Sequence, residues 1–204
     1  MIKFGVCLPT FQGASSRPHT IDFDGLESFA LRAEELGYDS LWAADHLMLG
    51  REGGMHEAWS VISALALTTS RIRLGTLVLC NTHRSPALTA KMVATLDQLS
   101  GGRLDLGIGT GWHKSEQESY GLPWQDDIPT RIAMFEEGLL LMQRLFSGER
   151  VSFDGEFYSL EGAVSQPRPV QQPHPPIWIG ASGERVMLRP GSYKHMTLPT
   201  KHSL

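Results

Sequence analysis

The sequence contains only two cysteines among its 204 residues, Cys7 and Cys80, and both lie inside apolar runs. It has neither the CxxC spacing of a zinc or redox site nor the cysteine density of a disulfide scaffold. This shortage excludes a fold that depends on cross-links. It favours a reduced compartment, so we expect a cytoplasmic protein with free thiols.

An excess of basic residues and long hydrophobic runs are also missing. The chain has 18 Lys and Arg against 22 Asp and Glu, which gives a formal net charge of −4. A domain that binds nucleic acid or an anionic membrane through electrostatics needs the opposite balance. No apolar run approaches the roughly 20 residues of a membrane span, and the first residues lack the apolar core of a signal peptide. We expect neither a nucleic-acid partner nor a membrane partner.

What the sequence does contain is a globular composition, with 41% hydrophobic and 20% charged residues. A chain of this length can bury about 70% of the surface that its unfolded form exposes, so one large core is feasible. Short β-type runs alternate along the chain with segments of helical period. The runs are mostly apolar rather than strictly alternating, as expected of parallel strands that are buried on both faces. They cover residues 2–8, 40–43, 72–80, 103–108 and 177–179.

Apolar residues at three- and four-residue spacing predict amphipathic helices between these runs. One stripe extends from Leu26 to Ala33 and ends before Gly37. Another extends from Leu88 to Leu99 and ends before Gly101-Gly102. Two further helices are predicted over residues 59–68 and 132–145.

An insertion separates the fourth and fifth strands. Asp154-Gly155, between residues 151–153 and 156–158, predicts a β-hairpin with a two-residue turn. The first four strands recur at the spacing of a βα unit. This order fits either an open doubly wound sheet or the first part of a (β/α)8 barrel, which typically needs about 250 residues. In both folds a site lies where the strands end.

The residues that follow the strands are therefore the candidates for a site. Asp45 and His46 follow the second strand, and a histidine beside a carboxylate can exchange a proton near neutral pH. A surface histidine next to a helix-capping aspartate would give the same pattern. The polar residues 81–84 follow the third strand. His46 and His56 have no third ligand at a helix spacing, so no metal is expected.

Glycines mark the ends of the fourth and fifth strands. Gly107, Gly109 and Gly111 begin inside a strand and lack the GxGxxG spacing of a dinucleotide site. We interpret them as positions where a flat ligand passes close over the backbone. Gly180 to Gly183 follow a strand and precede a predicted helix, so their N–H groups could hold a phosphate. A plain tight turn fits the same residues equally well.

Three segments together resemble the luciferase-like monooxygenase superfamily, and within it the branch of oxidoreductases that use the deazaflavin coenzyme F420. They are SLWAADH (40–46), LGTLVLCNTHRSPALTAKMVATLDQLSGGRLDLGIGTGW (74–112) and PIWIGASGER (176–185). The resemblance extends from residue 1 to about residue 188. It implies a (β/α)8 TIM barrel of which only about the first five βα units are present, with a β-hairpin inserted before strand five.

The resemblance also implies roles for individual residues around a planar cofactor ring. His46 and Asp45 would border the ring as the catalytic residues, with His46 giving or taking the proton that accompanies hydride transfer. A non-prolyl cis peptide at Leu77-Val78 would back the ring. The remaining cofactor contacts would come from Cys80, Asn81, Thr82, Gly109, Thr110, Gly111 and Trp112, and from Gly180, Ala181, Ser182 and Gly183 at the phosphate.

The implied activity is hydride transfer between F420 and a small organic substrate. Trp42, Trp112 and Trp124 are candidate apolar walls for that substrate, although each also fits as an ordinary core or rim aromatic. Sugar-phosphate-oxidising relatives have a carboxylate directly after the position of Gly111, where this chain has Trp112. A monooxygenase that uses reduced FMN is the alternative, because the same barrel accepts either ring. Family members are commonly dimers, so the resemblance also implies a homodimer.

The last residues break the pattern. Residues 185–204 include four basic residues and no acidic one, and Pro190 would interrupt the helix expected after Gly183. We therefore divide the chain into a partial luciferase-like barrel, residues 1–188, and an aberrant or disordered tail, residues 189–204. A truncated or frameshifted copy of a full barrel would have this sequence. It adds a third hypothesis, an inactive remnant.

Overall fold

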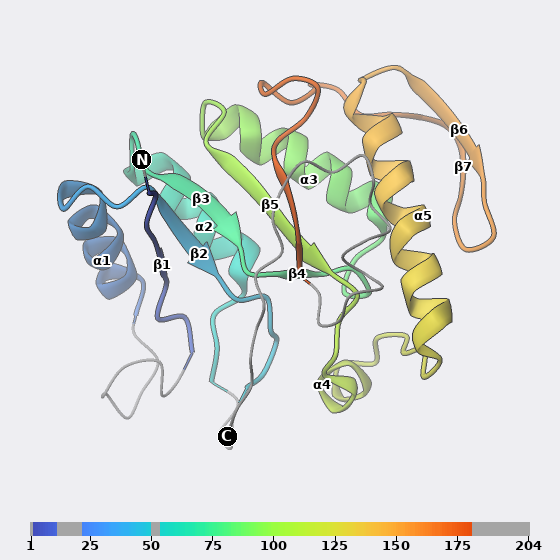
Figure 1. Cartoon of the computed structure of the whole chain (residues 1–204), viewed down its shortest axis with the longest axis horizontal. Coiled ribbons are helices and arrows are strands. Elements are labelled where there is room, and N and C mark those ends of the chain that lie inside the picture. The colour runs from blue at the N-terminus through green and yellow to red at the C-terminus, as the bar shows by residue number, and fades with distance from the viewer. Residues whose placement is uncertain (1, 12–21, 50–53, 181–204) are drawn as a thin grey trace.

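A parallel sheet forms the centre of the computed structural model, which describes residues 2–11, 22–49 and 54–180 (Figure 1). The strands pair side by side in the order β1, β2, β3 and β5, and all of these pairs are parallel. Their bounds are Gly5–Cys7 for β1, Ser40–Ala43 for β2, Arg73–Thr76 for β3 and Leu104–Gly109 for β5. This arrangement confirms the parallel pairing that the apolar runs predict.

Two further strands pair with β5. β4 (Leu79–Cys80) pairs with the end of β5, and β8 (Ile177–Gly180) pairs with it over four residues. The predicted run 72–80 is thus two strands, because a cis peptide bond between Leu77 and Val78 separates β3 from β4. The cis bond lies where the family resemblance placed it. The other predicted strands are found with small shifts at their ends.

Helices cover the sheet, and carboxylate side chains cap the first turn of some of them. In Figure 1, α2 (Ala58–Thr68) and α3 (Pro86–Leu99) lie behind the strands, while α1 (Phe23–Glu35) and α5 (Ile128–Phe146) flank them. Asp22 caps α1 by accepting the N–H of Gly25, and Glu57 caps α2 in the same way. All four predicted helices are confirmed. Their buried residues and the sheet form one core.

A fifth helix, α4 (Lys114–Ser119), was not predicted. Its six residues are KSEQES, and no apolar residue among them gives a helical period. The side chains that it buries are polar, Glu116 and Gln117. A helix that buries carboxylate and amide groups gives no hydrophobic pattern in the sequence, so the search for apolar stripes missed it.

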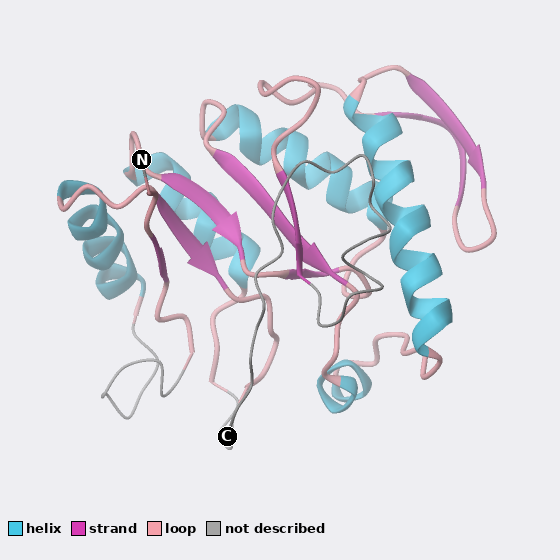
Figure 2. Cartoon of the chain, viewed as in Figure 1, coloured by secondary structure: helices cyan, strands magenta, loops and turns pink. Residues whose placement is uncertain are grey.

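The predicted hairpin is present, but its two-residue turn is wrong. β6 (Arg150–Asp154) pairs antiparallel with β7 (Ser159–Val164), so residues 155–158 form a longer turn (Figure 2). The carboxylate of Glu137 in α5 accepts the N–H groups of Glu156, Phe157 and Tyr158. The N–H groups of residues 156–158 therefore donate to the Glu137 carboxylate and not to a neighbouring strand. None of the helices in the described part of the chain combines the length and apolar composition of a membrane span.

Candidate active site

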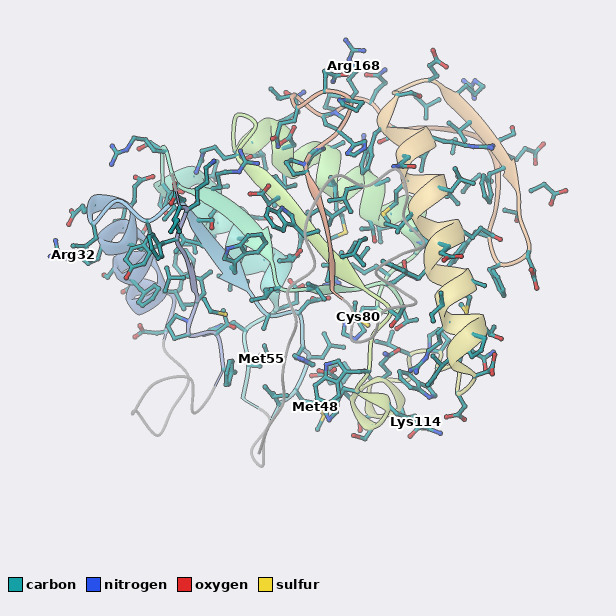
Figure 3. The ribbon with its side chains drawn as sticks, in the orientation of Figure 1. Arg32, Met48, Met55, Cys80, Lys114 and Arg168 are labelled. Atoms are coloured by element: carbon teal, nitrogen blue, oxygen red, sulfur yellow. The ribbon has the colours of Figure 1, made fainter. Side chains whose placement is uncertain are left out.

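Residues from distant parts of the chain meet at the carboxyl ends of the parallel strands. The arrowheads of β2, β3 and β5 in Figure 1 point toward the side on which α4 lies. Figure 3 shows Cys80, Met48 and Lys114 on that side, whereas Arg168 lies at the opposite side of the molecule. The predicted candidates Asp45, His46, Cys80 and Gly111 are brought together here. The predicted residues Ala181, Ser182 and Gly183 and the tail 189–204 lie outside the described residues.

Asp45 is the buried anion at the centre of this region. Its carboxylate accepts a hydrogen bond from the backbone N–H of Cys80 at 2.8 Å. It accepts two more from the Nη1 and Nη2 groups of Arg84, at 2.9 and 3.0 Å. His83 Nδ1 lies 3.4 Å from Asp45 Oδ2. Burial would raise the pKa of Asp45, but His83 and Arg84 outweigh it and hold the pKa at about 2. Asp45 therefore joins β4 to the loop after β2 as a fully ionised carboxylate.

His83 and Arg84 supply the positive charges that Asp45 pairs with. The His83 side chain is 3% exposed, and burial would lower its pKa, but its interactions with Asp45 and Cys80 raise the pKa to about 10. Arg84 also donates to Glu57 Oε1 at 2.6 Å. The sequence placed these two residues at the end of a strand without giving them a role. Their role could have been suspected from the sequence, because two basic residues follow directly after a strand whose end was predicted to border the site.

His46 is held by a residue that the sequence did not single out. Its Nδ1 lies 3.0 Å from Oε2 of Glu116 in α4. The other carboxylate oxygen, Oε1, accepts the backbone N–H groups of Leu47 and Met48. Burial would raise the pKa of Glu116, but its bonds with Met48, His46 and Leu47 lower it. Asp45 and His46 are adjacent in sequence but have different direct partners, and the His83 ring links the two groups, 3.4 Å from Asp45 Oδ2 and 4.0 Å from Glu116 Oε2.

Aromatic rings surround the His46 imidazole. The Trp112 ring meets it edge-on at 5.4 Å between centroids, and the His113 ring does so at 5.9 Å. Trp112 is 64% exposed, so it forms a wall on the solvent side. Trp42 instead fills the space above Gly5 and Gly75 in the middle of the sheet.

The last predicted aromatic wall, Trp124, is also separate from this group. The guanidinium of Arg131 stacks on its ring at 4.2 Å, and its Nε1 donates to Asp126. These contacts place it in the exposed segment before α5 rather than beside His46. Among the three predicted walls, only Trp112 packs against the candidate catalytic histidine.

His46, His113 and Glu116 each offer a ligand atom, and these atoms lie within 4.8 Å of one another. Two imidazoles and one carboxylate are a donor set that zinc accepts. His56, the other histidine considered above for a metal, is not part of this group. In the structure Glu116 Oε1 already accepts the N–H groups of Leu47 and Met48, and Oε2 lies 3.0 Å from His46 Nδ1. We therefore describe the cluster as a hydrogen-bond network of the protein.

Polar groups also gather around Cys80. Its Sγ lies 3.2 Å from Thr82 Oγ1, and that hydroxyl donates to Gln117 Oε1 at 2.7 Å. Gly111 has a φ of +79°, and a Cβ on it would lie 2.6 Å from Cys80 Sγ. Glycine is therefore required here both by the backbone conformation and by the neighbouring thiol. Thr110, which precedes it, is half-buried.

Neighbouring protein atoms explain why the other strand positions need glycine. Val78, which follows the cis bond, packs against the backbone of two neighbouring strands. A Cβ on Gly109 would lie 3.1 Å from a Val78 methyl, and a Cβ on Gly180 would lie 2.6 Å from one. A Cβ on Gly107 would collide with the carbonyl oxygen of Thr76. Protein atoms occupy the positions that a Cβ would take on these glycines, which by itself accounts for glycine there, and a ligand passing over them stays a prediction.

Two residues predicted to contact the cofactor form hydrogen bonds with other parts of the protein. The side chain of Asn81 is buried and donates to the Tyr158 hydroxyl of the hairpin turn at 3.4 Å. The N–H of Leu77 donates to the carbonyl of Ala43 at 2.7 Å, which ties the cis bond to β2. Their predicted roles at the cofactor stay predictions.

The parallel strands lie side by side in chain order, β1, β2, β3, β5 and β8, as the strands of a TIM barrel do. The luciferase-like monooxygenase family matches residues 2–203 of this sequence. The chain belongs to that family, as the sequence resemblance indicated.

Individual relatives show what the chain is similar to. The "F420-dependent glucose-6-phosphate dehydrogenase" of Amycolatopsis mediterranei is 38% identical over 164 residues, which cover 79% of this chain and 48% of the relative. The structure of an F420-dependent secondary alcohol dehydrogenase with an F420-acetone adduct superposes with a TM-score of 0.78 at 25% identity. This match covers 90% of our chain and 53% of that one.

A third relative shows the fold alone. The oxygenating constituent of 3,6-diketocamphane monooxygenase from Pseudomonas putida, in complex with FMN, has a TM-score of 0.72 at 23% identity. It covers 87% of this chain and 51% of its own. The chain thus spans about half the length of the relatives that it matches.

Proposed function

We propose that this chain contributes the cofactor-binding half of an F420-dependent oxidoreductase that transfers a hydride between the deazaflavin and the carbinol carbon of a small alcohol. The observation that carries the proposal is the placement of His46. Its ring packs edge-on against Trp112 and His113 at the carboxyl ends of the strands, and its Nδ1 lies 3.0 Å from Glu116 Oε2. Two relatives named for F420 are dehydrogenases, one of glucose-6-phosphate and one of secondary alcohols. Removal of a hydride from an alcohol needs a proton acceptor beside the hydride acceptor.

The residues at the strand ends fit a planar ring with polar edges. Cys80, Thr82 and Gln117 offer thiol, hydroxyl and amide groups beside Gly111, while Trp112 provides an apolar face. When bound, F420 supplies the carbon that accepts or releases the hydride. The protein residues supply orientation, exclusion of water and a proton acceptor.

The proton is the part of the reaction that His46 handles. When the alcohol is oxidised, its C–H bond breaks and the hydride leaves with its electron pair for the coenzyme. The O–H proton then passes to His46 Nε2, the ring nitrogen that Glu116 does not bind. In the reverse direction the same nitrogen returns the proton to the carbonyl oxygen, so atoms and charge balance both ways.

Parallel titrations of the purified protein with F420 and with FMN, followed by ligand fluorescence, test this proposal. We expect saturable F420 binding, and turnover of small secondary alcohols that His46→Ala abolishes while F420 binding remains. Trp112→Ala should raise the KM for the alcohol. Glu118→Gln, on the exposed face of α4, should change neither turnover nor F420 binding. Tight FMN binding without F420 binding would refute the choice of coenzyme.

A reduced-FMN monooxygenase is the second candidate, because the family carries the monooxygenase name and an FMN complex shares the fold. The third candidate is a remnant without catalysis of its own. Size-exclusion chromatography with thermal melting separates it from the other two. Soluble aggregate that binds neither ring would support the remnant, and a monodisperse species with a cooperative melt would oppose it.

A further inference from the structure

We propose that Glu116 is a positioning residue that holds neutral His46 in the Nδ1–H tautomer, which leaves Nε2 unprotonated as the proton acceptor. This inference rests on the proposed function, because it assigns the origin of the base used there. It makes α4, the helix that has no apolar pattern, part of the machinery that prepares the site. Nothing in the sequence motif that contains His46 predicts a partner 70 residues away.

The geometry leaves only one tautomer compatible with a hydrogen bond between the two side chains. The Glu116 side chain is 2% exposed, and its Oε2 lies 3.0 Å from His46 Nδ1. An ionised carboxylate accepts hydrogen bonds and donates none. Nδ1 must therefore carry a hydrogen, and in a neutral imidazole the lone pair is then on Nε2.

The carboxylate cannot rotate freely away from His46. Its Oε1 accepts the N–H groups of Leu47 and Met48, the two residues that follow His46. One side chain thus fixes both the imidazole and the backbone that carries it. Burial would raise the pKa of Glu116, but the hydrogen bonds from Met48 and Leu47 and the contact with His46 lower it, which favours the ionised carboxylate.

Two other histidines face Glu116 but are farther from it. His113 Nδ1 lies 3.6 Å and His83 Nε2 lies 4.0 Å from Glu116 Oε2, against 3.0 Å for His46. Their positive or polar edges favour the ionised carboxylate without replacing His46 as its hydrogen-bond partner. The three imidazoles therefore converge on one oxygen, and only His46 completes a hydrogen bond with it.

Glu116→Gln keeps the shape of the side chain but should move the hydrogen of the neutral His46 ring from Nδ1 to Nε2. The amide oxygen can still accept the N–H groups of Leu47 and Met48, which forces the amide NH₂ toward His46. That group donates to Nδ1, so the neutral imidazole must carry its hydrogen on Nε2. The variant should keep the fold and lose the base.

Nitrogen-15 NMR of the histidine rings tests this directly and needs no cofactor. At an alkaline pH at which the His46 ring is neutral, we expect the wild-type ring to carry its hydrogen on Nδ1 and the ring of the Glu116→Gln variant to carry it on Nε2. Glu118→Gln is the matched control in the same helix and should leave the wild-type tautomer. An Nε2–H tautomer in the wild-type protein overturns the proposal, whether or not the variant folds.

The kinetic consequence separates positioning from a structural role. If F420 binds, Glu116→Gln should lower the rate of alcohol oxidation about 10²- to 10⁴-fold, the range for losing a general base or its tautomer. F420 affinity should change little, and the melting temperature should fall by only a few degrees, because the amide replaces a buried carboxylate that accepts backbone N–H groups. An equal loss of rate and F420 affinity would overturn the positioning role. Absence of F420 binding in the wild-type protein would refute the proposed function while the NMR result still decides the tautomer.

Discussion

Replacing Asp45 with asparagine tests whether the buried network around it stabilises the fold. Asn keeps the size of the side chain but removes the charge that faces Arg84 and His83. Removing one partner of a buried ion pair typically costs about 3–5 kcal/mol, because the other charge stays buried without compensation. The Asp45 pKa of about 2 against an ordinary value of 3.8 corresponds to about 2.5 kcal/mol.

From these two values we expect Asp45→Asn to lower the free energy of unfolding by about 3 kcal/mol at neutral pH. In a domain of this size such a loss lowers the melting temperature by about 6–12 °C. Urea unfolding followed by circular dichroism measures the first quantity, and a thermal melt measures the second. Asp126→Asn is the matched control, because the Asp126 side chain is 75% exposed and pairs with Lys114 at the surface. A surface pair of this kind contributes about 0–1 kcal/mol.

The pH dependence gives the sign of the effect. A carboxyl whose pKa is lowered on folding stabilises the protein above its unfolded pKa, and that stabilisation is lost as the pH falls toward the folded pKa. The difference between wild type and Asp45→Asn should therefore be largest between about pH 5 and pH 6.5 and shrink between about pH 4 and pH 2, as Asp45 is protonated. It should also shrink as the pH rises from about 6.5 toward 10, because His83, whose pKa Asp45 helps to raise, is then deprotonated. A loss below about 1 kcal/mol at neutral pH, or a difference that does not shrink in acid, would refute the reasoning.

Two further predictions concern residues outside this network. Glu34 of α1 accepts the N–H groups of Ser70, Arg71 and Ile72, which lower its pKa to about 2 although burial would raise it. Glu34→Gln should therefore cost about 1–3 kcal/mol in urea unfolding at neutral pH. This cost should fade between about pH 4.5 and pH 2, and a cost that is independent of pH contradicts the assignment. Gly111→Ala should destabilise the protein more than Gly121→Ala, because both glycines have positive φ but only Gly111 faces Cys80; equal melting temperatures for the two variants would show that the thiol contact is unimportant.

Much of the fold could be predicted from the sequence, because local patterns report local structure. The stripe from Leu26 to Ala33 and the stop at Gly37 define α1, and Ser85-Pro86 marks the start of α3. Ser40 to Ala43 were predicted as a strand with the bounds that the structure has. Apolar period, caps and glycine stops act within a few residues, so they can be read along the chain.

The candidate site was predicted less completely. Position at a strand end identified Asp45, His46 and Gly111, and the family resemblance added Cys80 and located the cis bond at Leu77-Val78. Glu116 was missed because it lies in a short polar helix without an apolar pattern, and its hydrogen-bond partners are distant in the sequence. The role of a side chain in such a network depends on its neighbours in space, and these neighbours leave no periodic mark.

The sequence by itself determined the order of the βα units and the end of the sheet at which polar side chains gather, because both follow from local hydrophobic pattern and chain direction. Only the tertiary structure decided which charges meet. It separates adjacent Asp45 and His46, pairing the first with His83 and Arg84 and the second with Glu116. The physical reason is that electrostatic and hydrogen-bond energies depend on distances of a few ångströms between side chains, which the folded backbone alone fixes.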